Sequence, residues 1–299
     1  MSFNSIQRHS ITVLAALLLS ICAHAQNREP FKQLLAAPEF FGPYAFQVPD
    51  MLDGSICSNL YAEIGFDHIV GRLAGRDHKD YTNAPTYCVH VPLWTDRASV
   101  SIWGEFQEFY NDNEYVRQAR GVNPEEPLKS SDTGTLYFSL DMQLLKESVY
   151  RPAIALRAAI QTATGDDYER ARHYDAPGYY FELSTGKDFK VYRNWSVRPA
   201  ASLNFVCWQV SNGQQNDALG YGAQLTLKHP VTSFVMAYGQ YKGKDGRGDM
   251  PRVIKGRLNF HIGRWSPFIY YQHGFKEWPF DQYRIGLSYS IDILRYIRK

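Results

Sequence analysis

The sequence has no apolar run after residue 25 that is long enough to cross a bilayer as a helix. Such a helix needs about 20 consecutive apolar residues, so a helical membrane protein is excluded. The formal net charge is only +2. The field of the whole chain therefore gives no reason to expect nucleic acid or a strongly acidic partner.

Cysteine is scarce. The chain has 4 cysteines, of which Cys22 lies in the leader described below and Cys57, Cys88 and Cys207 remain. An odd number cannot all pair within one chain, so a disulfide framework does not organise this fold. We expect at least one of the three to act as a small buried apolar side chain.

Motifs for cofactors and metals are also missing. The sequence shows no Gly-rich nucleotide loop, no paired-cysteine zinc spacing and no helical heptads. Acidic residues and histidines cluster at 76–80 and 165–175, but neither cluster follows a calcium-loop pattern, and Lys79, Arg170 and Arg172 among them would repel a cation. We expect no cofactor and no metal, and we interpret both clusters as solvated loops.

The first 25 residues have the pattern of a signal peptide. Arg8 and His9 precede an apolar run over 11–22, and Ala23-His24-Ala25 supplies an Ala-x-Ala cleavage site. We therefore expect residues 1–25 to direct export. Residues 26–54 contain four prolines and no sustained period, which predicts an irregular periplasmic lead-in or a plug.

Aromatic side chains and alternation are what the sequence has in abundance. It is 44% hydrophobic and 15% aromatic, and from residue 55 onward apolar and polar side chains alternate in stretches separated by Gly, Pro, Asp and Asn. This pattern predicts about twelve strands in a single domain over 55–299. The predicted strands are 57–67, 84–94, 97–109, 134–146, 152–163, 177–187, 195–210, 218–229, 231–242, 251–262, 266–276 and 281–293.

The connections and the strand faces specify the class further. Short connections such as 95–97 alternate with long polar ones such as 110–132, which is the up-and-down pattern of an outer-membrane barrel. In 283–293, apolar side chains such as Ile285 alternate with polar ones such as Arg284. A soluble sandwich would also alternate, but a spanning strand needs about 9–11 residues, against the usual 5–6 or so in soluble sheets.

We therefore predict an all-β protein, a closed antiparallel up-and-down transmembrane β-barrel of about twelve strands in the outer membrane. Outer-membrane lipid and the barrel-assembly machinery are the implied partners. Five of the six tryptophans fall beside predicted connections, where a ring can lie at the boundary between lipid and water. They are Trp94, Trp195, Trp208, Trp265 and Trp278.

Residues 207–217 read CWQVSNGQQND. Their Ser211-Asn212-Gly213 resembles the His-x-Ser-Asn-Gly motif of two outer-membrane barrel families, phospholipase A and the lipid A 3-O-deacylase. The resemblance implies Ser211 as a nucleophile, but Gln209 stands where the general base should be, and an amide has no useful basicity near neutral pH. Because Asn and Gly are also ordinary turn residues, we favour a loop at the rim.

Charged side chains of both signs fall on the predicted inner face. They either pair across the interior and fill it, or line a narrow aqueous path. The predicted lumen-lining residues are Glu63, Glu105, Asp141, Arg157, Glu182, Arg198, Lys255, Arg257 and Arg284.

Without a base near Ser211, the leading hypothesis is a non-catalytic pore or transporter for a small solute or lipid-related cargo. One alternative is a lipid acyl-ester hydrolase that uses Ser211 and an unrecognised base. The other is a structural or adhesion barrel whose interior is blocked by paired charges and the N-terminal segment.

Overall fold

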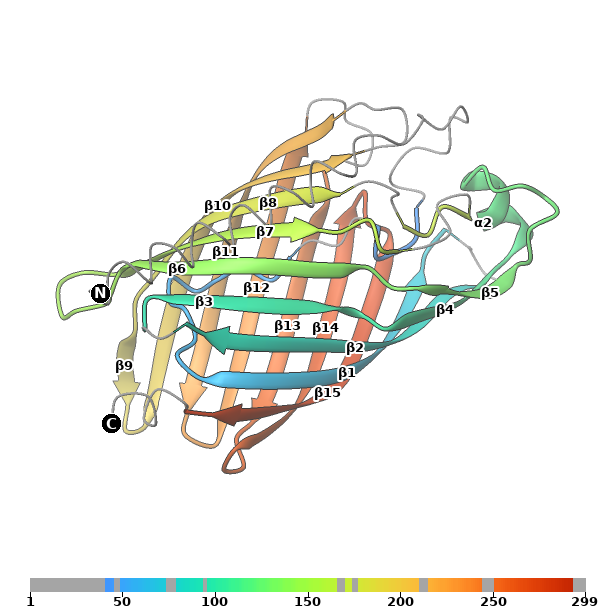
Figure 1. Ribbon diagram of the computed structural model, residues 1–299. Helices are drawn as coiled ribbons and strands as arrows, with labels where there is room; N and C mark the ends of the chain where they lie inside the picture. The colour runs from blue at the N-terminus through green and yellow to red at the C-terminus, as the bar shows by residue number, and fades with distance from the viewer. Residues whose placement is uncertain are drawn as a thin grey trace, which may run out of the picture.

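A closed ring of twelve antiparallel strands forms the body of the molecule (Figure 1). The computed structural model describes residues 41–45, 49–73, 79–93, 96–165, 170–173, 177–209, 215–243 and 250–292. The predicted leader, residues 1–25, lies outside these ranges. Among the described residues, no helix is both long and apolar enough to cross a membrane.

The twelve strands follow one another around the ring in chain order, and β1 pairs with both β2 and β15. This double pairing leaves the ring without a free edge, so the predicted barrel is confirmed. The ring strands are β1 (Leu60–Gly71), β2 (Asp80–Pro92), β3 (Ala98–Glu105), β6 (Leu136–Leu145), β7 (Ala153–Gln161), β8 (Gly178–Gly186), β10 (Trp195–Gln209), β11 (Gln215–His229), β12 (Thr232–Gly243), β13 (Arg252–Phe260), β14 (Trp265–Lys276) and β15 (Phe280–Ile291).

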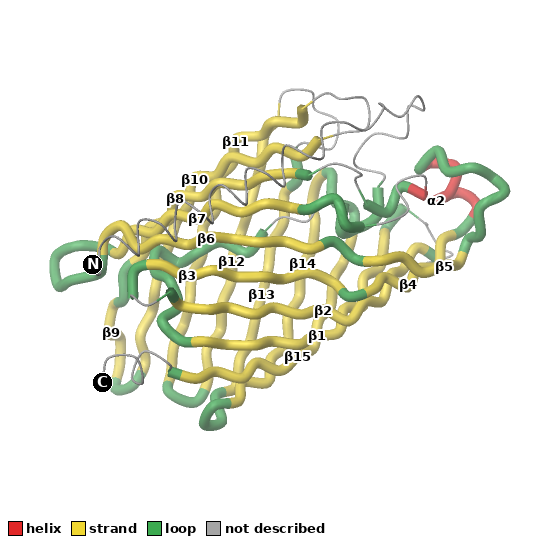
Figure 2. The backbone as a smooth tube through the Cα atoms, viewed as in Figure 1, coloured by secondary structure: helices red, strands yellow, loops and turns green. Residues whose placement is uncertain are grey.

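Four further elements lie beyond the ring. Strand β9 (Phe189–Tyr192) pairs with β10 at the end where the connections are short, which we call the short-turn end. Strand β4 (Gln107–Asp112), helix α2 (Glu114–Ala119) and strand β5 (Lys129–Thr133) project from the opposite, long-loop end (Figure 2). Strand β9, helix α2 and strand β5 were not predicted, because each is short and lies within a polar connection, whereas β4 overlaps the end of the predicted strand 97–109.

The predicted strand 97–109 is divided into β3 and β4. The two halves pair with β2 in different registers, Thr86 opposite Glu105 and Asn83 opposite Phe109. Pro85 lies between these pairs and has no N–H to continue the ladder. It accepts instead from the Phe106 N–H at 2.9 Å, so the wall bends at this point.

Side chains alternate between the two surfaces of the wall as expected. Ile64 and Ile285 point outward and are 62% and 65% exposed, whereas Asp67 and Gln282 point inward and are fully buried. Strands β6 and β8 show the same split, with Asp141 and Glu182 buried beside outward-facing apolar neighbours. An apolar exterior around a polar interior is the arrangement of a barrel surrounded by hydrocarbon.

The tryptophans divide between the two surfaces. Trp265 lies on the outer surface at the short-turn end with its ring 4.5 Å from that of Tyr289, as expected for a boundary residue. The expectation is wrong for Trp278, which is buried inside the long-loop end and donates to the Pro43 carbonyl at 3.0 Å. Trp103, in mid-strand, faces inward and stacks on Tyr137.

Candidate functional site: the occupied lumen

Residues 41–45 and 49–57, here called the inner segment, run inside the ring from the long-loop end to the short-turn end. At the long-loop end the Tyr44 hydroxyl donates to Asp67 of β1 at 2.7 Å. The Tyr44 carbonyl accepts from the Tyr137 hydroxyl of β6 at 3.3 Å. Two strands that are not neighbours in the ring therefore hold the same residue.

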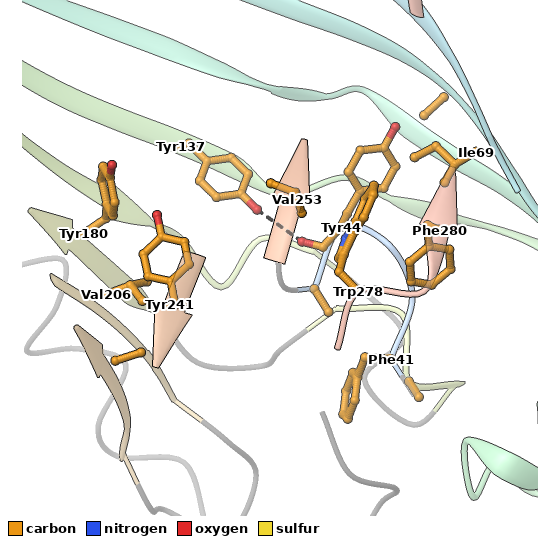
Figure 3. Close-up of a cluster of buried hydrophobic side chains, with 14 of the residues drawn as sticks. Phe41, Tyr44, Ile69, Tyr137, Tyr180, Val206, Tyr241, Val253, Trp278 and Phe280 are labelled. Atoms are coloured by element: carbon orange, nitrogen blue, oxygen red, sulfur yellow. Dashed lines mark hydrogen bonds between the residues drawn. The ribbon is translucent and has the colours of Figure 1, made fainter. Parts of the chain in front are cut away.

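An apolar cluster surrounds this end of the inner segment (Figure 3). Phe41 and Tyr44 pack with side chains that project inward from the ring, such as Ile69 of β1 and Phe280 of β15, and with Trp278. Phe41, Tyr44, Trp278 and Phe280 are each less than 5% exposed. The cluster thus closes the long-loop end of the lumen with apolar surface.

Polar contacts hold the middle of the inner segment. The Leu52 N–H donates to Glu182 of β8 at 2.7 Å. The ammonium of Lys255 on β13 lies 2.7 Å from the Asp50 carboxylate, and Arg157 of β7 donates to the Asp50 carbonyl at 2.9 Å. Here the wall holds the segment mainly through its backbone, whose hydrogen bonds do not depend on the side chain at each position.

The short-turn end repeats this mode of contact. Gln143 of β6 accepts from the Ile56 N–H at 3.0 Å and donates to the Gly54 carbonyl at 2.8 Å. Arg198 of β10 donates to the Asp53 carbonyl at 3.0 Å.

At Gly54, which has φ +83°, a Cβ would lie 2.7 Å from the Thr185 carbonyl carbon and would also collide with the Gly186 nitrogen. Only glycine fits this contact between two backbones.

The nine charged residues predicted to line the lumen all make a hydrogen bond or ion pair inside the ring. Glu105 accepts from the Thr135 N–H at 2.7 Å, and Glu182 holds Leu52 as described. The other seven are in ion pairs: Arg157–Asp141 at 2.7 Å, Arg257–Glu63 at 2.6 Å, Arg198–Glu147 at 2.6 Å, Lys255–Asp50 at 2.7 Å and Arg284–Asp67 at 2.5 Å. That they line a solute pathway stays a prediction.

Asp67 is a further carboxylate inside the ring, with four hydrogen bonds, and it was not among the predicted residues. It accepts from two nitrogens of Arg284, at 2.5 and 2.8 Å, from Gln282 at 2.8 Å and from Tyr44 at 2.7 Å. The alternation of side chains along β1 could have identified Asp67, because it lies four residues after Glu63 and therefore on the same face of the strand. Asp50 and Asp53 gave no such signal, since their segment has no period.

A second charged network joins the long loops. Arg172 is buried, donates to Glu108 at 2.5 Å and to Thr82 at 2.6 Å, and lies over the Tyr110 ring. Arg120, at the end of α2, donates to Asp112 at 2.8 Å and to Asp80 at 3.0 Å.

Burial alone would lower the pKa of Arg120, but the carboxylates of Asp80 and Asp112 outweigh it and raise the pKa above its usual range. The guanidinium therefore stays charged, and the long-loop end is fixed by ion pairs around the apolar cluster.

A cavity of about 170 Å³ lies between the inner segment and the wall. Its lining residues include Tyr61, Tyr270 and the acidic residues Asp50, Glu63 and Glu105. Its basic lining residues are Arg157, Lys255, Arg257 and Arg284. The lumen thus retains a polar space even with the inner segment in place.

The candidate esterase residues belong to the β10–β11 connection and the strand end before it. Ser211 lies in the β10–β11 connection, 210–214, outside the described residues, and the side chain of Gln209 is not described either. Within the described ranges no group of His, Cys, Asp or Glu could hold a metal ion. Cys57, Cys88 and Cys207 are free thiols, and Cys207 is fully buried, as expected for one of them.

No protein-family model matches the chain, and none of the curated proteins matches it. Solved structures of similar fold include a KdgM porin, with 10% identity and a TM-score of 0.47 over 77% of this chain and 99% of that chain. An outer-membrane channel from Pseudomonas putida F1 has 13% identity and a TM-score of 0.48 over 82% and 100%. LpxR from Salmonella typhimurium has 12% identity and a TM-score of 0.46 over 77% and 99%. These are similarities of fold.

Fold and interior together define the class as an outer-membrane β-barrel protein, because the ring is closed, apolar outside and charged within.

Proposed function

We propose that this protein is a non-catalytic pore of the outer membrane for a small polar solute, and that its lumen is closed by the inner segment. The observation that carries the proposal is the polar wall behind that segment. Glu182, Gln143 and Arg198 hold the segment's backbone through side-chain hydrogen bonds. Water or a polar solute can replace such bonds, so withdrawal of the segment would leave a surface that wets.

The kind of contact that holds the inner segment bears on whether it can leave. A hydrogen bond that the segment loses on leaving can be replaced by water, whereas apolar surface that it uncovers cannot be satisfied in this way. In this protein apolar packing is concentrated at the long-loop end, while the rest of the inner face is charged. The inner segment is then a removable plug, and the ring of twelve strands forms the pore, with outer-membrane lipid and the barrel-assembly machinery as partners.

Planar-bilayer recording on the purified full chain tests this proposal. We expect the wild-type protein to be closed for most of the time and to open briefly, because the inner segment must leave the lumen for ions to pass. Opening events that disappear when the protein is omitted from the bilayer would support the pore. A complete absence of conductance, in the wild type and also in the Gly54→Val variant described in the Discussion, would overturn it.

The hydrolase alternative makes a different prediction. If Ser211 is only part of a rim loop, Ser211→Ala will leave fatty-acid release from phospholipid vesicles at the level of the wild-type protein, which should be at background. The measurement is acyl-ester release by purified protein in the presence of detergent. Release that is above background in the wild type and lost in Ser211→Ala would establish the enzyme instead.

A further inference from the structure

Basic side chains cross the outer surface of β12, β13 and β14 at their long-loop ends. The three strands lie side by side in the ring (Figure 1). Arg252 of β13 pairs with Gln240 of β12 on one side and with Lys276 of β14 on the other, and directly paired residues project from the same face of a sheet. Lys242 lies two residues beyond Gln240 on β12 and therefore also on that face. Lys242, Arg252 and Lys276 are all exposed, and we call them the basic row.

The faces of the strands show that the basic row points away from the lumen. Tyr241 and Val253, each next to a member of the row in the sequence, are buried inside the ring. Phe234 and Met236 share a face of β12 with Lys242 and are each 44% exposed. The row thus lies on the surface that faces lipid, with apolar side chains on the same surface nearer the short-turn end.

Tyrosines mark the height of the basic row relative to the membrane. Tyr221 of β11 is 49% exposed, and its hydroxyl donates to the side chain of Gln240 at 3.2 Å. The Tyr238 hydroxyl donates to the same oxygen at 2.8 Å. Tyrosines on the outer surface of a barrel gather at the boundary between hydrocarbon and water, and Gln240 lies directly opposite Arg252. The basic row is therefore level with lipid headgroups, and because the long loops of such barrels face outward, these headgroups belong to the outer leaflet.

The cations of the row are available to a ligand. Neither Lys242 nor Arg252 makes an ion pair or a side-chain hydrogen bond with any residue that the structure describes. Lys276 has a carboxylate at 3.1 Å, that of Glu277, but its side chain is 42% exposed. Across the described residues, the row therefore carries more positive charge than its neighbours neutralise.

The row is also confined to one part of the ring. Strands β6, β7 and β8, farther around the ring, carry a single basic residue, Arg157, which pairs with Asp141 on the inner face. Arg72, which follows β1 at the long-loop end, is already neutralised, because the Asp281 carboxylate lies 3.0 Å from it. A belt that only matched the average charge of the membrane would surround the barrel, whereas a cluster on neighbouring strands fits one bound molecule.

We infer that the basic row binds an outer-leaflet glycolipid through two phosphates on its headgroup. Phosphate oxygens are strong acceptors for the donors of Lys and Arg. Neighbouring strands are about 4.8 Å apart, so the row extends roughly 10 Å from β12 to β14, which is wider than one phosphate. The acyl chains of the glycolipid pack on the apolar surface around Phe234 and Met236. This site lies outside the ring and goes beyond the proposed function, because it does not depend on whether the lumen opens.

Native mass spectrometry of the full chain in detergent, with diphosphorylated lipid A as the probe, tests the inference. Each Lys or Arg near a lipid surface contributes about a fivefold gain in affinity. We therefore expect the dissociation constant of the probe to rise about 100-fold in the triple variant Lys242→Gln/Arg252→Gln/Lys276→Gln. Arg252→Gln alone should raise it about fivefold, which keeps the test decisive if the triple variant does not fold. Lys242→Arg/Lys276→Arg keeps the charge and should bind the probe as the wild type does.

The matched control removes three exposed lysines that lie outside the row, in Lys79→Gln/Lys129→Gln/Lys190→Gln. We expect this variant to keep wild-type affinity, and equal weakening in both triple variants would overturn the site. Unchanged affinity in Arg252→Gln would overturn it as well. Phosphatidylglycerol that binds as tightly as the probe would overturn the requirement for two phosphates, and displacement of the probe by inorganic phosphate alone would assign the row to a free anion instead of a lipid.

Discussion

Replacing Asp67 by alanine is expected to destabilise the barrel by about 3–5 kcal/mol, because it leaves the charge of Arg284 inside the ring without its carboxylate. Asp67 is fully buried, and the side chain of Arg284 is 18% exposed. The substitution also removes the acceptor of Gln282 and of Tyr44. Four hydrogen bonds converge on this one side chain, so its loss affects β1, β15 and the inner segment together.

Equilibrium urea unfolding of the folded barrel in lipid vesicles measures this change in the free energy of unfolding. The control is the double variant Asp67→Leu/Arg284→Met, which removes both charges and keeps apolar volume. We expect the double variant to be more stable than Asp67→Ala, because removing both members of a buried pair costs less than isolating one. If the double variant were as unstable as the single one, the ion pair would not be the source of the effect.

Replacing Gly54 by valine is expected to shift the inner segment out of the lumen. The new Cβ would collide with the Gly186 nitrogen and lie 2.9 Å from the Ala153 carbonyl oxygen. These are backbone atoms of the ring and cannot turn aside. Overpacking of this kind costs about 1–3 kcal/mol, which corresponds to a rise of about 5–150-fold in the ratio of open to closed states.

The measurement is the open probability of single channels in planar bilayers. Gly263→Val is the matched control, because Gly263 in the β13–β14 turn also has a positive φ, +62°, but a Cβ there meets nothing within 4 Å. It carries the same backbone strain without the collision, and its open probability should stay at the wild-type level. Similar openings in both variants would mean that strain, and not displacement of the segment, alters the pore.

The ring could be predicted from the sequence because alternation is a local property. The run around Ile285 and Arg284 shows apolar and polar side chains in strict turn, and the structure places the first outside and the second inside. Each strand of a membrane barrel has one face toward lipid and one toward the interior, so apolar and polar side chains alternate in every strand. The division at Pro85 was missed, because it depends on the register between two strands.

The site was only partly predictable. Parity identified Arg257 and Glu63 as inward-facing, but their pairing joins strands that are not neighbours in the ring, and this depends on curvature that no local pattern encodes. Trp278 was expected at the lipid boundary because it lies beside a connection, yet its indole N–H finds the Pro43 carbonyl inside the ring. The contacts of Asp50 follow from the path of an irregular segment, which has no period to reveal its partners.

The seam between β1 and β15 constrains how the molecule is assembled. It joins Leu60 to Ile291, so the first and last strands can pair only after all the strands between them are available. Contacts between residues so far apart in the sequence form slowly. The inner segment, which precedes Leu60 in the sequence, lies inside the ring that this pairing closes. Two orders of assembly are therefore possible. The inner segment is either enclosed when β1 pairs with β15, or it enters the lumen after the barrel has closed, past charged side chains of the inner face.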